Sequence, residues 1–188
     1  MLISKRGEDE NMYSKFIKRT LCTTLAFLLI FAMFVVVIDP PLSARDMIFD
    51  GDEIEVQAVT VKKKLYWVFA DLCASKDTIK ILRDLNKAYP FASSEKEMME
   101  QKALGILNRE IVSKAVRYIA DGDAPSLGKL MVEAEDLFNT YVGVMSEALK
   151  APKLHKILHD PVISKWIFGG KGVGSHGDGS VQFLARDE

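Results

Sequence analysis

The hydrophobic pattern begins with an uninterrupted apolar run, Leu21–Ile38, which contains no charged residue, glycine or proline. As a helix this run would be about 27 Å long at ~1.5 Å per residue, close to the ~30 Å hydrocarbon core of a bilayer. Basic residues precede the run, and the positive-inside rule would therefore place the amino terminus in the cytoplasm. We predict a polar basic leader over 1–20, a transmembrane-like helix over 21–38 and a linker over 39–45.

Two other interpretations of the apolar run stay open. It could be a cleaved secretory signal, although Leu42-Ser43-Ala44 is a poor cleavage site. It could also be buried protein, or sequence that replaces what a parent protein has at this point. The first interpretation predicts a single-pass membrane protein and the last predicts a cytoplasmic one.

Two strands are predicted after the linker. Residues 52–61 alternate, with Ile54, Val56 and Ala58 on one side, which predicts a half-buried strand. Leu65–Ala70 is a continuous run of apolar β-formers, which predicts a central strand. A turn of three lysines separates the two, and we therefore expect them to form an antiparallel pair.

Four helices are predicted next. The first would be capped by Ser75 and end at Pro90, and Ser94-x-x-Glu97 is a capping box that would open the second. Asp121-Gly122 would end the second helix. In each of the first three helices apolar residues recur at helical spacing, which indicates a face packed into a core. They are Ile81, Leu82 and Leu85 in the first helix, Leu104, Leu107, Ile111, Ala115 and Ile119 in the second, and Leu127, Leu130, Met131, Ala134, Leu137, Phe138 and Tyr141 in the third. The fourth helix is short and is predicted over 152–159.

Composition narrows the function classes. The chain has 188 residues, a length that suits one domain with an appendage. Its formal net charge of −1 excludes a broadly cationic nucleic-acid binder. Two cysteines cannot build a disulfide framework or a zinc module. His155 and His159 have i, i+4 spacing and could hold a metal only with a third ligand such as His176; two surface histidines near a helix end are the simpler interpretation.

Glycine is concentrated near the carboxy terminus. Residues 169–179 hold six of the twelve glycines and precede a predicted strand, Val181–Ala185. Residues 172–177 match G-x-G-x-x-G literally, but they precede a strand instead of following one, and we therefore reject the dinucleotide fingerprint. No Gly-Lys-Ser/Thr ends the stretch, and we therefore reject a Walker A loop as well. A flexible hairpin and a ligand-binding loop stay as alternatives, and the polar residues Lys171, Ser175 and Asp178 favour the second.

This glycine stretch resembles the late glycine-rich motif of the GHMP kinases (galactokinase, homoserine kinase and mevalonate kinase relatives), whose usual form is similar to G-A-K-x-T-G-A-G-x-G-G. Phe49-Asp50-Gly51-Asp52, Leu65–Leu72, Lys76-Asp77-Thr78, Leu127–Met131 and Ala151–His155 also look like this family, particularly its sugar-kinase-like branch. The match covers about residues 46–188. It implies an α+β domain of the carboxy-terminal GHMP kinase type, with antiparallel strands and about four helices. It also implies ATP and Mg²⁺ as cofactors, and a nucleotide and substrate cleft lined by Gly170, Lys171, Gly172, Gly174, Ser175, Gly177, Asp178 and Gly179.

The family's phosphate loop, of the form P-x-x-x-G-L-x-S-S, does not occur in the sequence. Catalytic residues are therefore unknown, and the closing helix that the family places after the last strand is also missing. We expect the carboxy-terminal portion of an ATP-dependent small-molecule kinase, with a sugar as the substrate, truncated and inactive without the other half. The alternative is a non-catalytic, membrane-anchored remnant or interaction domain.

Overall fold

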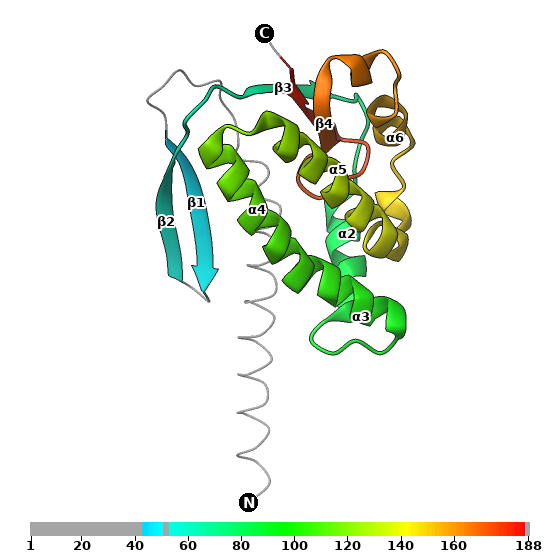
Figure 1. Cartoon of the computed structure of the whole chain (residues 1–188). Coiled ribbons are helices and arrows are strands. Elements are labelled where there is room, and N and C mark those ends of the chain that lie inside the picture. Colours follow the sequence, from blue (N-terminus) through cyan, green and yellow to red (C-terminus); the bar gives the residue numbers. More distant parts are fainter. Residues whose placement is uncertain (1–42, 51–52, 187–188) are drawn as a thin grey trace, which may run out of the picture.

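The computed structural model describes residues 43–50 and 53–186, which form an α+β fold (Figure 1). Short 3₁₀ turns join several of the elements, and the segment Ala103–Leu107 is π-helical. The strands are β1 (Ser43–Asp50), β2 (Glu53–Thr60), β3 (Tyr66–Asp71), β4 (Ile167–Gly172) and β5 (Ser180–Ala185), and the helices are α2 (Thr78–Leu85), α3 (Glu95–Lys102), α4 (Asn108–Asp121), α5 (Ala124–Tyr141) and α6 (Pro152–Leu158).

The strands form two antiparallel sheets, β1-β2 and β3-β5-β4. The predicted pairing of residues 52–61 with Leu65–Ala70 is therefore wrong. The lysine segment between them does not make a tight turn, because the Lys62 N–H donates to the Ala120 carbonyl at 2.9 Å and the Lys62 ammonium lies 2.7 Å from Asp121. This segment is bound to the end of α4, and it directs β2 and β3 into different sheets.

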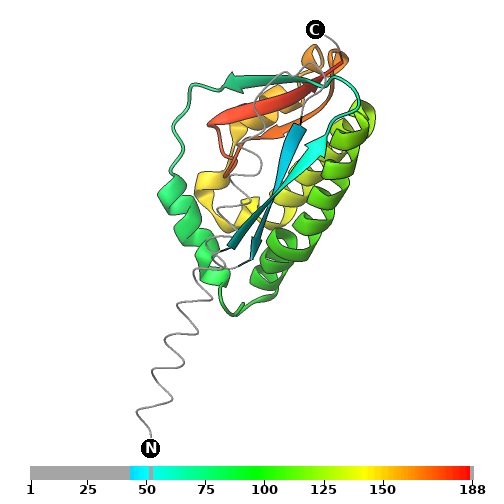
Figure 2. The ribbon, with the colours of Figure 1, turned by 90° about the vertical axis from the view of Figure 1, so that its left-hand side faces the viewer.

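The burial predicted for these two strands is also wrong. Val56 of β2 is 51% exposed, on the side of the strand that the alternation assigned to the core. Strand β3 lies at an edge of its sheet, and β5 occupies the centre. Val68 and Phe69 of β3 are 48% and 40% exposed as a result. Figure 2 shows the β1-β2 hairpin in front of the helices, apart from the other sheet.

The helix signals are mostly confirmed. Ser94 caps α3 by accepting a hydrogen bond from the Glu97 N–H at 3.3 Å, and Gly122 ends α4 with a φ of +64°. The predicted second helix is the continuous run of α3, the π-helical segment and α4. The cap of α2 is Asp77, whose carboxylate accepts from the Lys80 N–H at 2.8 Å, and not Ser75.

The three-stranded sheet has helices on both faces. On one face Leu184 packs with Leu127 and Met131 of α5, and on the other face Val181 and Phe183 pack with α6. The helix α5 approaches β4 closely because glycines meet at the crossing: a Cβ on Gly169 would lie 2.0 Å from the carbonyl oxygen of Gly128. A side chain at either position would push the helix off the sheet.

The predicted transmembrane-like helix over Leu21–Ile38 lies outside the described residues, as do the leader and most of the linker. Among residues 43–50 and 53–186, none of the helices has the length and apolar character that crossing a membrane requires.

Candidate functional site

The glycine stretch forms a β-hairpin. Its first glycines lie within β4, and residues 173–179 make the loop that leads into β5. The close packing explains two of the strand glycines. A Cβ on Gly170 would lie 2.5 Å from the ring of Phe183, and one on Gly172 would lie 2.8 Å from the ring of His176. The loop turns through positive φ angles at Gly174 (+62°), His176 (+58°) and Gly177 (+72°).

Lys171 faces the interior of the protein. Its side chain is 1% exposed, and its ammonium donates to the Gly172 carbonyl at 2.6 Å. Burial lowers the pKa of Lys171 to about 7, against the opposing influence of the Glu135 carboxylate. The sequence had suggested only that this residue belongs to a cleft, and that assignment stays a prediction.

Glu135 of α5 holds the hairpin from its inner side. One carboxylate oxygen accepts from the Gly172 N–H at 2.9 Å and lies 3.1 Å from Nδ1 of His176, and the other accepts from the Asn139 amide at 3.2 Å. Burial by itself would raise the pKa of Glu135. The His176 ring, the Gly172 N–H and the Lys171 charge outweigh it and lower this pKa to about 2. Glu135 is therefore ionised at neutral pH.

His176 is 2% exposed and stacks on Phe138, with ring centroids 3.7 Å apart and an interplanar angle of 7°. Burial and the Lys171 charge lower the pKa of His176, against the opposing influence of Glu135. Its Nε2 atom has no hydrogen-bond partner among the described residues. An aromatic stack thus fixes the orientation of the loop residue that faces Glu135.

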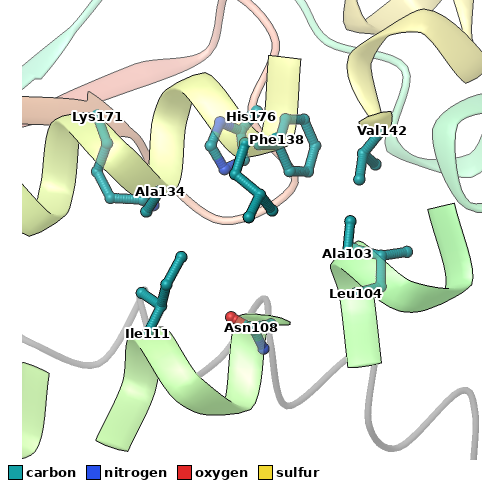
Figure 3. A pocket seen from close by; sticks show the side chains of 10 residues that line it. Ala103, Leu104, Asn108, Ile111, Ala134, Phe138, Val142, Lys171 and His176 are labelled. Carbon is teal, nitrogen blue, oxygen red and sulfur yellow. The ribbon is translucent and has the colours of Figure 1, made fainter. Parts of the chain in front are cut away.

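A small cavity lies between the hairpin and the helices (Figure 3). Lys171, His176 and Phe138 line one wall, and Asn108 and Ile111 of α4 line the opposite wall. The space open to the centre of a water molecule is about 10 Å³, which is close to the volume that one buried water needs. The cavity is far too small for a nucleotide.

The outer side of the loop contacts two further elements. Asp178 accepts a hydrogen bond from the Leu154 N–H at 2.9 Å, in the first turn of α6. Lys76, which precedes α2, reaches the Val173 carbonyl at 3.3 Å. Ser175 is 6% exposed, and its hydroxyl has no partner among the described residues. All eight residues that the sequence had suggested for the cleft belong to this hairpin, three of them in β4 and five in the loop, and their place in a nucleotide cleft stays a prediction.

The histidines considered for a metal site have other contacts. Nε2 of His155 lies 3.3 Å from the Asn139 side-chain oxygen, and Nδ1 of His159 lies 2.7 Å from the His155 carbonyl oxygen. His176 stacks on Phe138 in the interior. Within the part of the chain that the structure describes, no group of three histidine, cysteine, aspartate or glutamate side chains is placed to hold a metal.

Sequence reasoning missed Glu135 and Asn139, and it gave Lys76 no role at the site. A signal for Glu135 exists in the pattern of α5, since it lies four residues after Met131 and three before Phe138, on the apolar face. A carboxylate at a core position needs a partner. Lys76 stood only in the family-like segment Lys76-Asp77-Thr78, and its place beside the loop comes from tertiary packing.

The chain is similar to L. major mevalonate kinase, solved in complex with R-mevalonate, with 20% sequence identity and a TM-score of 0.55. The match covers 76% of this chain and 40% of the kinase chain. No family model matches the sequence, and no curated protein does. The neighbour is a GHMP kinase but not a sugar kinase, and it therefore does not support the sugar-kinase branch. The described chain has an α+β fold like that of a GHMP kinase.

Proposed function

We propose that this chain is the carboxy-terminal portion of an ATP-dependent GHMP-type small-molecule kinase, which transfers a phosphoryl group to an alcohol when a second portion supplies the phosphate loop. The observation that carries the proposal is the glycine hairpin. It combines the residues of the family motif with a backbone held on three sides, by Glu135, by Asp178 and by Lys76. The similarity of fold to a mevalonate kinase supports it.

Phosphoryl transfer depends chiefly on positioning and on charge stabilisation. In the proposal this chain contributes positioning: α5 and α6 fix the loop, whose backbone can then form one wall of a nucleotide and substrate cleft. The described carboxylates do not suit Mg²⁺, because Glu135 and Asp178 already accept hydrogen bonds from backbone N–H groups. The carboxylates that would hold Mg²⁺ beside the nucleotide phosphates must come from elsewhere.

The finer proposal is a sugar acceptor. It rests on the sequence motifs alone, and mevalonate is the rival acceptor because the structural neighbour is a mevalonate kinase. A panel of free hexoses, pentoses and mevalonate separates the two. Phosphorylation of a sugar supports the sugar branch, and phosphorylation of mevalonate alone contradicts it.

The test of the kinase proposal is phosphoryl transfer from ATP with the full chain and an amino-terminal GHMP kinase portion supplied in trans. The matched control is the amino-terminal portion without this chain. We expect transfer only when both are present. We also expect ATP binding by this chain alone to be weaker than ~1 mM, which corresponds to about 4 kcal/mol of binding free energy. Micromolar ATP binding by the chain alone would show that it needs no separate phosphate loop.

A non-catalytic interaction domain is the second candidate. The observation that favours it is the absence of the phosphate-loop pattern from the sequence, together with the internal hydrogen bonds of the hairpin's polar groups: Lys171 donates to the Gly172 carbonyl, and the Gly172 N–H donates to Glu135 of α5. A correctly folded chain that supports no transfer to any acceptor in the panel, with an active amino-terminal partner, would favour this candidate over the kinase.

A further inference from the structure

Lys76 lies across the outer side of the glycine loop. A Cβ on Gly179 would come within 3.2 Å of Lys76 Cδ, and one on Gly177 within 3.7 Å of Lys76 Cβ and Cδ. These two glycines therefore leave room for the lysine side chain. The half-buried side chain ends with its ammonium 3.3 Å from the Val173 carbonyl oxygen, a long hydrogen bond for a group with three donors.

No carboxylate neutralises Lys76 among the described residues. Two acids adjoin it or the glycines it contacts, and both have other roles: Asp77 caps α2, and Asp178, between Gly177 and Gly179, accepts from the Leu154 N–H. Burial lowers the pKa of Lys76, and no opposing charge restores it. The Lys76 charge in turn lowers the pKa of both Lys171 and His176, so the three groups influence one another electrostatically. The carboxylate that opposes this effect on Lys171 and His176 is Glu135.

The loop beneath Lys76 has a sharply turned backbone and a buried hydroxyl without a partner among the described residues. The backbone has positive φ angles at Gly174, His176 and Gly177, a conformation that occurs in the anion-binding concavities of proteins, and the His176 N–H donates to the Val173 carbonyl at 3.3 Å. The buried Ser175 hydroxyl has no partner among the described residues. A lysine without a carboxylate, a turned backbone and an unpartnered hydroxyl all favour a negatively charged ligand.

We propose that Lys76 is a ligand-contacting residue: its ammonium leaves the Val173 carbonyl and binds an anionic phosphate oxygen at the outer side of the glycine loop. The inference rests on the proposed function and deepens it, because it names a residue outside the glycine motif that contacts the phosphate-bearing substrate. The Val173 contact keeps the ammonium in place until the ligand arrives.

The test is titration of the full chain with inorganic pyrophosphate, followed by NMR of the lysine side-chain Cε and Nζ signals. Lys76→Met removes the charge and keeps most of the apolar volume, and Lys76→Arg keeps the charge. Lys153→Met is the matched control, because the Lys153 ammonium also donates to backbone carbonyls, those of Leu72 and Cys73, but is exposed. Thermal melts of all variants check that they fold.

We expect pyrophosphate to shift the Lys76 signals, and Lys76→Met to weaken binding by about tenfold or more, as loss of a charged hydrogen bond does. Lys76→Arg should bind within about threefold of the wild type, and Lys153→Met should bind as the wild type does. Equal pyrophosphate binding by wild type and Lys76→Met overturns the inference. Lys76 signals that do not move at ~20 mM pyrophosphate overturn it too. In both cases the in-trans transfer assay still decides the kinase proposal by itself.

Discussion

Two glutamates of neighbouring helices are buried to almost the same extent, but one is ionised at neutral pH and the other is protonated. Glu135 of α5 is 5% exposed and Glu100 of α3 is fully buried. Glu135 accepts hydrogen bonds, and the His176 ring, the Gly172 N–H and the Lys171 charge lower its pKa to about 2 against the effect of burial. Neither oxygen of Glu100 has a partner among the described residues; burial, with a contribution from the Glu97 charge, raises its pKa to about 8.

The difference shows that donors, and not burial alone, decide whether a carboxylate in this protein is charged. At neutral pH Glu135 is an anion that organises the glycine hairpin, whereas Glu100 is a buried neutral acid. Removing the first leaves the Gly172 N–H without its acceptor and takes away the negative charge that favours the charged form of Lys171 in the interior. Removing the second takes away a group that destabilises the fold whenever it ionises.

The largest effect is expected from Glu135→Ala. This substitution leaves the buried Gly172 N–H without its acceptor and removes the negative charge that favours the charged form of the buried Lys171, and we predict a loss of about 3–5 kcal/mol in the free energy of unfolding at pH 7. Glu133→Ala is the control on the same helix, because Glu133 is exposed and lies 3.8 Å from Lys114; we expect it to change stability by less than about 0.5 kcal/mol. Urea unfolding measures both. Equal effects of the two substitutions would contradict the role given to Glu135.

Glu100→Gln should act in the opposite direction and only at high pH. The folded-state pKa of Glu100 is raised from 4.5 to about 8, so the folded protein holds a proton that the unfolded chain releases, and stability falls as pH rises between those values. The substitution removes this loss and is expected to stabilise the protein by up to about 4 kcal/mol at pH 9 and very little at pH 4.5. Glu95→Gln, at an exposed position of the same helix, is the control. A stability difference that does not change with pH would refute the assignment.

We predict that protonation of Glu135 causes most of the loss in the free energy of unfolding at acid pH. Its folded pKa is lowered from 4.5 to about 2, so the stability it contributes is present above pH 4.5 and is lost as pH falls toward 2. The expected loss is about 3 kcal/mol, at about 1.4 kcal/mol for each pKa unit. Urea unfolding at pH 5 and pH 2.5 measures it in wild type and in Glu135→Gln. The variant should show a flatter profile, and an equally steep one would assign the loss to other groups.

Asn139→Ala should have the smallest effect of the four. It removes the amide that donates to Glu135 at 3.2 Å and leaves the other donors of that carboxylate in place. We expect a loss of about 1 kcal/mol, together with a higher onset pH for acid unfolding, because Glu135 becomes easier to protonate. Thr140→Ala is the control, since the Thr140 hydroxyl is exposed and donates to the Asp136 carbonyl within its own helix. An unchanged onset pH for Asn139→Ala would mean that Asn139 does not help to hold Glu135 ionised.

Much of the helical structure could be predicted from the sequence because its signals are local. Ser94 and Gly122 act through backbone groups within a few residues, and the apolar stripes of α4 and α5 need only a core on one side. The glycine stretch was recognised for the same reason. Its density within eleven residues indicates close backbone packing whatever surrounds it, and Gly170 against Phe183 is such a packing contact.

Strand pairing and charge states were decided by tertiary structure alone. The partners of β3 and β2 depend on where the Lys62 segment crosses α4, a contact between residues almost sixty positions apart. In the sequence Glu100 and Glu135 are both glutamates in predicted helices. Their pKa values separate because Gly172 and His176 come to Glu135 through the fold, while no donor comes to Glu100. Local patterns specify which residues form a helix, but the energy of a buried charge depends on groups that only folding brings within 3 Å or so of it.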